Sequence, residues 1–318
     1  MRKLTIATTA LLLLPTLAHA FDWSEDKTRY LSDPSYLPAK GELDGESSLY
    51  YKSSGYDISY SDGSPPTSQR TKSYRGSQSF TYGLTRRIAI GVTESYQHAD
   101  RTVDSSNGQS KLVFSGLEDP TIHLRGRLIP QSFSPVYVDP YAAYSPDLLA
   151  DKAANKSTNG TVAQGGQIFT MGLYAGREMK SLTTELGFLS QYEGSRSVDY
   201  SNGNTGTISS RWTLSLNWNN QIRWTDSIFT NAGLSYSHTE GADYTTPNSL
   251  PFSMASYPSY SLHVSPGVVL VPNRLTLTTE LKYSKDGSIT KTSSDASTSQ
   301  LKSNGEYYFG LHLRYKIM

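Results

Sequence analysis

Few residues in this 318-residue chain have the types and spacing that chemistry requires. His98 precedes the run Ser105-Ser106-Asn107, and a histidine within hydrogen-bond reach of a serine can act as the base in ester hydrolysis. Seven or eight residues separate them, however, and the run Ser-Asn-Gly is typical of turns. The pattern favours a solvated loop over a hydrolytic site.

A second set of candidates is Asp243 with His238 and Glu240, which could serve acid–base chemistry in peptide hydrolysis. These residues also fall in a polar, turn-forming stretch. The six histidines are scattered, cysteine is missing, and we find no metal-ligand spacing or nucleotide-binding motif. The sequence therefore predicts a protein that is not an enzyme and uses no metal or other cofactor.

The first twenty residues have the features of a secretory signal peptide. Arg2 and Lys3 begin it, an apolar stretch follows over 6–17, and Ala18-His19-Ala20 ends it with a small-x-small cleavage pattern. The apolar stretch is too short for a helix to span a bilayer core of about 30 Å. We predict cleavage after Ala20 and export from the cytoplasm.

The charge of the predicted mature chain is balanced. The signal holds two of the 29 basic residues and none of the 28 acidic ones, which leaves 27 basic against 28 acidic residues. A nucleic-acid partner would normally require a basic excess or a basic stripe. We therefore expect no nucleic-acid partner.

The composition after the signal suits a membrane β-barrel better than a soluble domain. Tyrosine (23) far outnumbers phenylalanine (9), and mean hydropathy is −0.47. The longest purely aliphatic run is Val268-Val269-Leu270-Val271, which is far shorter than a membrane-spanning helix. A closed barrel needs no long apolar run, because only alternate residues of each strand face lipid.

Alternation with period two runs through most of the chain. Near the end, Phe309, Leu311 and Leu313 alternate with polar residues, as in a strand with one apolar and one polar face. The same pattern recurs often enough to predict twelve strands. They are expected near 46–60, 71–84, 87–99, 119–129, 135–146, 166–177, 181–194, 207–223, 227–239, 257–271, 274–287 and 303–317.

The connections between these strands alternate between short and long. The five short ones include Thr85-Arg86 and Pro272-Asn273, and the six long ones are polar and expected to be solvated loops: 61–70, 100–116, 148–165, 195–205, 241–256 and 288–302. Short periplasmic turns and long outer loops are typical of bacterial outer-membrane barrels. The sequence thus predicts an all-β, antiparallel up-and-down barrel over 46–318 in the outer membrane of a Gram-negative bacterium, with both termini periplasmic. A soluble β-sandwich explains the alternation alone, without the signal or the loop lengths.

Aromatic residues gather towards strand ends, where amphipathic rings settle at the level of lipid headgroups. The predicted girdle includes Trp212, Trp218, Trp224, Tyr236, Tyr307 and Tyr315. The opposite, inward faces carry the charges. The lumen-lining candidates are His123, Arg125, Arg127, Glu185, Arg211, Arg223, Glu280, Lys282, His312 and Arg314.

Two interpretations of these inward charges stay open. They could pair across a filled barrel and stabilise it, or they could line a channel and bias which solutes pass. Twelve strands lie between the eight whose interior side chains can fill and the sixteen that leave an aqueous channel, so strand number does not decide. The segment 21–45, which carries Pro34 and Pro38, is predicted to be a periplasmic extension or a strap that enters the lumen.

One stretch carries a family resemblance. Residues 115–128, which begin Ser-Gly-Leu-Glu-Asp-Pro, resemble the Ser-Gly-Leu-Gly-Asp strand opening of the MetA-pathway phenol-degradation family of outer-membrane proteins. Residues 82–92 are similar to that family's strand-turn-strand just upstream, and Glu118 replaces the family's usual glycine. The resemblance is sharp over about 50 residues. It implies a barrel and transport, and it supplies no catalytic residue.

These observations lead to three functional hypotheses. The first is a passive outer-membrane channel or transporter for small solutes, including aromatic or otherwise poorly soluble ones. The second is a non-conducting barrel that acts through its outer loops in adhesion, and the third is an outer-membrane hydrolase. The expected partners are outer-membrane lipid, a small-molecule solute, and the barrel-assembly machinery, which would recognise the last strand despite Met318 following Tyr315 and Ile317.

Overall fold

The computed structural model describes residues 31–34, 36–106, 108–149, 153–155, 158–161, 165–200, 205–246 and 249–318. Only the backbone is described in 153–155, 158–161, 199–200, 246 and 249–250. The predicted signal peptide and residues 21–30 lie outside the described part. Within that part, no helix has both the length and the apolar character needed to cross a bilayer.

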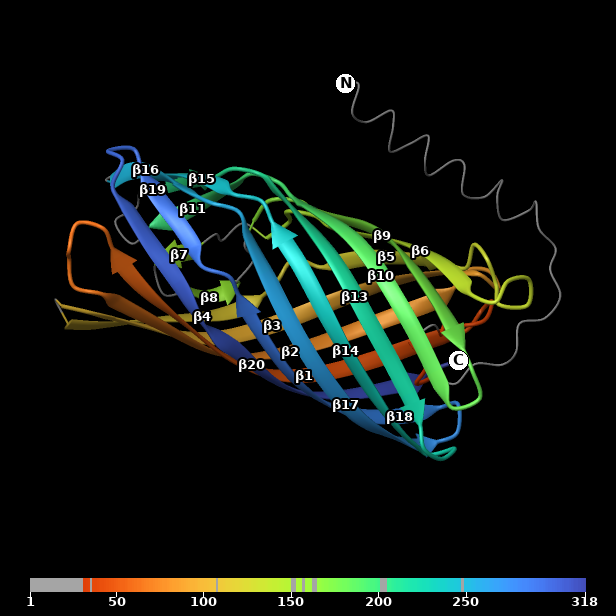
Figure 1. Cartoon of the computed structure of the whole chain (residues 1–318). Coiled ribbons are helices and arrows are strands. Elements are labelled where there is room, and N and C mark those ends of the chain that lie inside the picture. Colours follow the sequence, from red (N-terminus) through yellow and green to blue (C-terminus); the bar gives the residue numbers. More distant parts are fainter. Residues whose placement is uncertain are drawn as a thin grey trace, which may run out of the picture.

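Twelve strands of the described chain close into an antiparallel barrel (Figure 1). Each strand pairs with the next one around the wall, and the last pairs with the first. In order, they are β1 (Leu43–Tyr60), β2 (Thr67–Gly83), β3 (Ile88–Ser105), β5 (Thr121–Gly126), β6 (Tyr137–Ser145), β9 (Ile168–Glu178), β10 (Leu182–Glu193), β13 (Arg211–Arg223), β14 (Ile228–Thr239), β17 (Tyr257–Val271), β18 (Leu275–Asp286) and β20 (Thr298–Lys316). The predicted all-β, antiparallel barrel of twelve strands is therefore confirmed.

The seam between β1 and β20 is long. Its register runs from Asp44↔Lys316 to Tyr60↔Ser299, with one irregularity at Gly55/Tyr56. A closed wall leaves no strand edge, so its peptide groups are paired without water. This is why a chain of low hydropathy can span lipid.

Eight shorter strands in the described residues continue the wall beyond one end of the barrel (Figure 1). The six long connections expected to be solvated loops therefore contain strand residues, and that part of the prediction was wrong. Their Thr, Tyr and Val residues favour extended backbone, and neighbouring extensions pair with one another, as β12 does with β15. These strands are β4 (Gly108–Leu117), β7 (Ala153–Asn155), β8 (Thr158–Thr161), β11 (Arg196–Tyr200), β12 (Thr205–Ile208), β15 (Ala242–Thr246), β16 (Ser249–Met254) and β19 (Ile289–Ser293).

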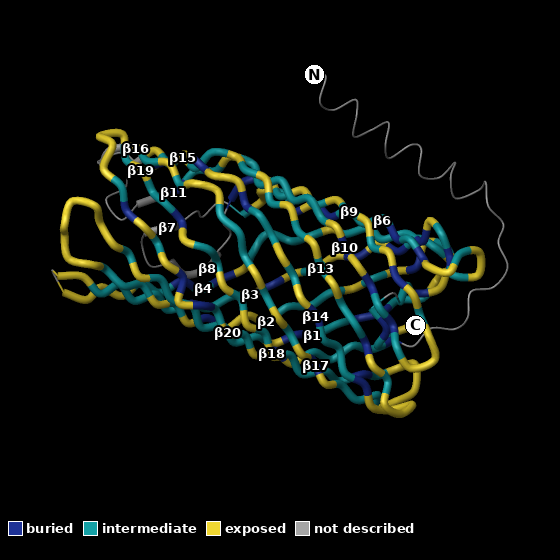
Figure 2. Tube along the Cα trace, viewed as in Figure 1, coloured by how far each residue is buried: buried dark blue, intermediate teal, exposed yellow. Residues whose placement is uncertain are grey.

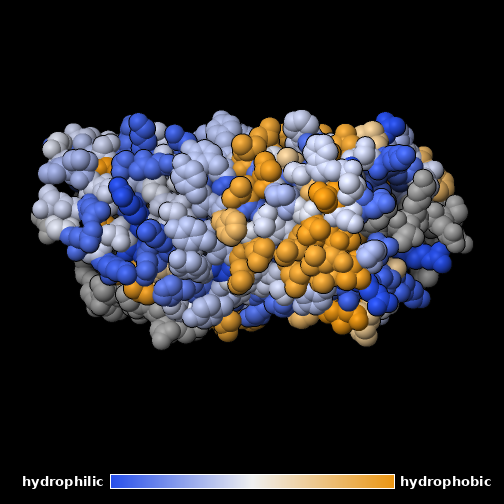
Figure 3. Space-filling model, turned by 90° about the horizontal axis from the view of Figure 1, so that it is seen from below, coloured by the Kyte–Doolittle hydropathy of each residue, from blue (hydrophilic) through white to orange (hydrophobic). Residues whose placement is uncertain are grey.

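Exposed residues alternate with more buried ones along many of the strands (Figure 2). Many of the exposed positions carry large apolar side chains. On β13, Leu214 and Leu216 are 45% and 52% exposed, whereas the intervening side chains are polar. Apolar side chains gather in a band across the outer wall, with hydrophilic surface towards both ends (Figure 3). This distribution is the reverse of a soluble domain and matches a lipid-facing belt.

A ring packed over a glycine recurs in the wall. A Cβ atom added at Gly45 of β1 would lie 2.5 Å from the Tyr315 ring of β20. Only a residue without a side chain leaves room for that ring, so this pair locks the two strands that close the barrel.

Candidate functional site in the barrel interior

A buried network of charges occupies the barrel interior near the short turns. The Arg125 side chain on β5 donates from Nη2 to Glu185 Oε2 of β10 at 2.7 Å, and from Nε to Asp139 Oδ2 of β6 at 3.1 Å. Arg127 also donates to Asp139, and its side chain is 2% exposed. The Tyr137 hydroxyl donates to Glu185 at 2.9 Å. Three strands are thereby tied together by ion pairs with little access to solvent.

Residues 31–34 bind directly to this end of the barrel interior. Asp33 Oδ1 lies 2.9 Å from Arg223 Nη2, and both side chains are about nine-tenths buried. Gln221 Nε2 donates to the Ser32 carbonyl at 2.7 Å, and Leu31 is 2% exposed.

The same segment also contacts the opposite part of the wall. Arg125 Nη1 donates to the Pro34 carbonyl at 2.8 Å, and the Arg314 guanidinium lies 4.9 Å from the Tyr36 ring centre. Residues 31–34 and Tyr36 therefore touch side chains from β5, β13 and β20, which lie far apart around the wall. Arg125 and Arg223 thus have a role that the sequence did not reveal.

His312, four residues before the end of β20, is the centre of a second cluster. Its Nε2 lies 3.2 Å from Glu280 Oε2, its Nδ1 lies 3.0 Å from Ser48 Oγ, and Glu46 is 3.5 Å away. The edge of the Tyr50 ring meets the imidazole at a centroid distance of 5.0 Å. The imidazole thus links the two strands on either side of β20.

Further ion pairs lie towards the extended end. Arg211 pairs with Glu193 at 2.8 Å, and Lys52 with Glu306 at 2.9 Å. Lys282 Nζ lies 5.3 Å from the Tyr308 ring centre, within cation–π range.

All ten lumen candidates have side chains on the inner face, and most of them contact each other or a carboxylate. His123 lies apart from the clusters, with its Nε2 3.3 Å from Thr81 Oγ1. The partners Asp33, Glu46, Tyr36 and Tyr137 were not predicted. Asp33 and Tyr36 fall in a segment without periodicity, and Tyr137 carries no charge, so only proximity in the fold reveals them.

The six girdle candidates project from the outer wall. Trp224 is 64% exposed and Tyr307 60%, whereas the Tyr315 ring is partly covered by its packing on Gly45. Trp218 Nε1 donates to Thr184 Oγ1 of the neighbouring strand at 3.2 Å. Their level relative to lipid stays a prediction.

The catalytic candidates are not brought together as the sequence suggested. His98 Nδ1 lies 2.5 Å from Ser115 Oγ, and Ser105 Oγ instead donates to the Gly108 carbonyl. Asp243 accepts from Ser253 Oγ, and Glu240 accepts from the Trp212 amide. Among the described residues, no group of three or more His, Cys, Asp or Glu could hold a metal ion.

Comparison with known structures identifies the same architecture. The chain is similar to the COG4313 outer membrane channel from Pseudomonas putida F1, with a TM-score of 0.53, 12% identity, and coverage of 93% of this chain and 100% of that one. The shared fold is that of an outer-membrane barrel. Identity this low shows the fold alone.

More distant barrels also match, at TM-scores that carry no functional argument. The translocator domain of the autotransporter NalP from Neisseria meningitidis matches at 0.48 with 10% identity, over 99% of this chain and 98% of that one. The outer membrane protease OmpT from Escherichia coli matches at 0.35 with 9% identity, over 89% and 99%. No family model matches the sequence. No curated protein matches it either.

Proposed function

We propose that this protein is a passive outer-membrane channel for small solutes, closed at its short-turn end by residues 31–42. The observation that carries this proposal is the polar, charged interior of a twelve-strand wall with the N-terminal segment bound inside one end. The likeness to an outer-membrane channel supports the same function.

Residues 31–42 would act as a removable strap. Their contacts with the wall include a buried ion pair, two side-chain bonds to backbone carbonyls and one buried leucine. Tyr36 and Glu42 add contacts with Arg314 and Lys316, and Gly41 and Glu42 exchange backbone hydrogen bonds with Gly83. Such contacts fix a segment in place, yet all can be broken without unpairing a strand. Passage would then require the strap to leave while the wall stays intact.

The chemistry of the interior suggests which solutes pass. Charges there are largely paired within the wall, as in Arg211–Glu193 and Lys52–Glu306. The lumen therefore has no strong net positive or negative potential that would select ions by charge. Small polar or weakly polar molecules fit this interior better than multivalent ions do. We include aromatic solutes among the candidates because residues 82–92 and 115–128 resemble the phenol-degradation family.

The remaining parts of the proposal concern export and membrane insertion. The signal peptide would direct the chain across the inner membrane, and β20 would present the C-terminal strand to the barrel-assembly machinery. Both termini would then lie in the periplasm, with the extended end outside the cell. No catalytic residue or cofactor is required.

Planar-bilayer recording tests the channel. The refolded mature protein should conduct in brief openings, and a variant that lacks 21–42 should conduct continuously, because its short-turn end is uncovered. A barrel that does not conduct in either form, although it migrates as folded protein on unheated gels, would instead support the adhesion alternative.

A further inference from the structure

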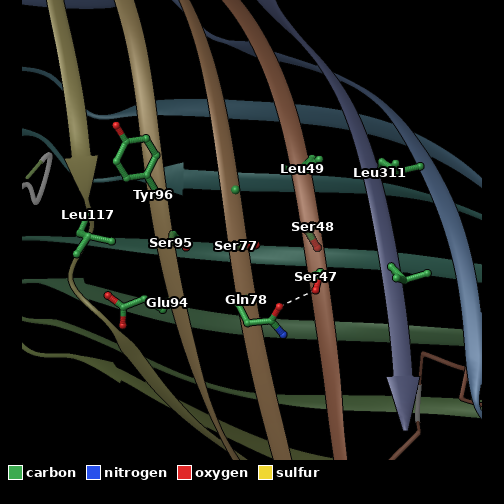
Figure 4. Close-up of a pocket in the computed structure, with 12 residues that line it drawn as sticks. Ser47, Ser48, Leu49, Ser77, Gln78, Glu94, Ser95, Tyr96, Leu117 and Leu311 are labelled. Atoms are coloured by element: carbon green, nitrogen blue, oxygen red, sulfur yellow. Dashed lines mark hydrogen bonds between the residues drawn. The ribbon is translucent and has the colours of Figure 1, made fainter. Parts of the chain in front are cut away.

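A groove of about 620 Å³ lies on the outer wall, across β20, β1, β2 and β3 (Figure 4). Its floor is at Gly76, where the wall carries no side chain. Leu49 and Leu311 stand on one side, and Tyr96 and Leu117 on the other (Figure 4). The groove therefore opens towards lipid and has mainly apolar walls.

One end of the groove carries three polar side chains, Ser47, Gln78 and Glu94, which are paired across neighbouring strands. We place this row at mid-height of the lipid-facing surface from the exposed rings on either side of it. On β2, Gln78 is four residues from each of two exposed rings, Tyr82 and Tyr74. Because such rings settle at the headgroup levels, the row falls in the hydrocarbon region between them.

The three polar groups differ in what they contact. Ser47 Oγ donates to Gln78 Oε1 at 2.6 Å, and Gln78 Nε2 donates to the Tyr315 hydroxyl at 3.0 Å. Both ends of the amide are thus occupied. The exposed Glu94 carboxyl, in contrast, has no hydrogen bond or ion pair with any residue that the structure describes.

A carboxyl group that faces hydrocarbon without a partner is costly, since neither water nor lipid tails satisfy it. A hydrogen-bond donor bound in the groove would remove that cost. Lipid headgroups carry donors, but they lie at the level of the aromatic rings and not at mid-height. The matching chemistry is a small molecule dissolved in the bilayer, apolar over most of its surface and carrying one donor group.

We propose that this groove binds such a molecule, a membrane-dissolved amphiphile whose hydroxyl or amine donates to Glu94 while its apolar part lies over Gly76 between Leu49 and Tyr96. The groove's volume falls in the range of small-molecule sites and its lining is mainly apolar, while its open side faces lipid. The site lies on the outside of the wall, so it does not depend on conduction through the lumen.

Photolabelling in bilayer nanodiscs tests the proposal. The probe is an eight-carbon alkyl alcohol that carries a diazirine, and its methyl ether serves as the analogue without a donor. We expect the alcohol to label the peptides that contain Leu49, Tyr96 or Leu117 saturably, and about fivefold more than the ether does, the factor that one net hydrogen bond supplies. Labelled positions are mapped by mass spectrometry.

Matched variants separate the two parts of the site. Glu94→Leu should lower labelling by the alcohol to the level of the ether, and Glu94→Gln, which keeps an acceptor oxygen, should retain it. Gly76→Leu should abolish labelling in the groove. A Cβ at that position makes only ordinary contact with Leu49, at 3.6 Å, so the barrel should still fold. Ala232→Leu, on the lipid-facing side of β14, is the control that changes nothing.

Three results would overturn the proposal. Equal labelling by alcohol and ether would identify the occupant as bulk lipid. Labelling that survives Gly76→Leu would place the probe elsewhere. A groove protected from both probes in a protein that crosslinks as a dimer through β1 to β3 would make the occupant a second copy of the chain.

Discussion

The ion pair between Asp33 and Arg223 provides the sharpest test of the strap. We consider Asp33→Ala, which removes the acidic partner and leaves the Arg223 guanidinium inside the barrel. The two side chains are 9% and 10% exposed, so solvent screens the pair little. Breaking a buried pair on one side costs about 3 kcal/mol.

This cost destabilises the bound state of the strap relative to its detached state, and it does not change the stability of the barrel wall. A difference of about 3 kcal/mol corresponds to roughly a hundredfold change in an equilibrium constant. The population with a detached strap should therefore rise about a hundredfold while the barrel itself stays folded. Buried Leu31 and the carbonyl contacts of Ser32 and Pro34 continue to hold the segment, so detachment stays partial.

Single-channel recording measures this effect directly. Asp33→Ala should raise the open probability with unchanged conductance of each opening, because the wall that sets conductance is the same. Asp33→Asn, which keeps a hydrogen-bond acceptor, should give an intermediate increase. Asp62→Ala removes a carboxylate from an exposed turn and serves as the control. Open probability that stays at the wild-type value in Asp33→Ala, together with unchanged conductance on deletion of 21–42, would refute the strap as the closing element.

Three further predictions concern the wall and its short-turn end. Glu185→Ala should lower the free energy of unfolding by about 3 kcal/mol, as seen in urea titrations in detergent, because it leaves Asp139 as the one carboxylate facing both Arg125 and Arg127 and removes the acceptor of the Tyr137 hydroxyl; a loss below about 1 kcal/mol would contradict a structural role. Gly45→Val should lower the free energy of unfolding by about 2 kcal/mol, because the valine displaces the Tyr315 ring. In a Tyr315→Ala background the same substitution should lower it by less. Equal decreases in both backgrounds would exclude the packing explanation. Burial raises the pKa of Glu42, but hydrogen bonds from Lys316 and a backbone amide outweigh it and hold the pKa below the usual value. The contribution of Glu42 is therefore present above the ordinary glutamate pKa of about 4.3 and lost as pH falls further. The amide protection factors of 36–42, taken relative to the intrinsic exchange rate at each pH, should therefore fall in acid, and less so in Lys316→Ala.

The strands were predictable because successive residues of a barrel strand face lipid and lumen in turn, so apolar and polar residues alternate along the sequence. The alternation over 181–194 gave β10 (Leu182–Glu193) to within a residue, and that over 257–271 gave β17 with both ends correct. Strand ends outside the belt were less predictable, as at β3, which continues to Ser105. There the wall leaves lipid, both faces become polar, and the alternation disappears.

The direction of each side chain followed from the same period, but its partner did not. Arg125 and Arg127 were expected to face inward. Nothing in the sequence near Arg125 identifies Glu185, sixty residues away, as its ion-pair partner. Likewise His98 was compared with Ser105 and Ser106, which follow it closely, whereas the hairpin of β3 and β4 places Ser115 opposite it.

The sequence alone thus predicted the twelve strands of the barrel wall and which side of each strand is apolar, because both depend on residues that are neighbours along one strand. The tertiary structure decided which charges pair, where residues 31–34 and Tyr36 bind, and that Glu94 stands at the end of an apolar groove. Those features depend on the register between strands and on closure of β20 against β1, which bring together residues that no local period relates.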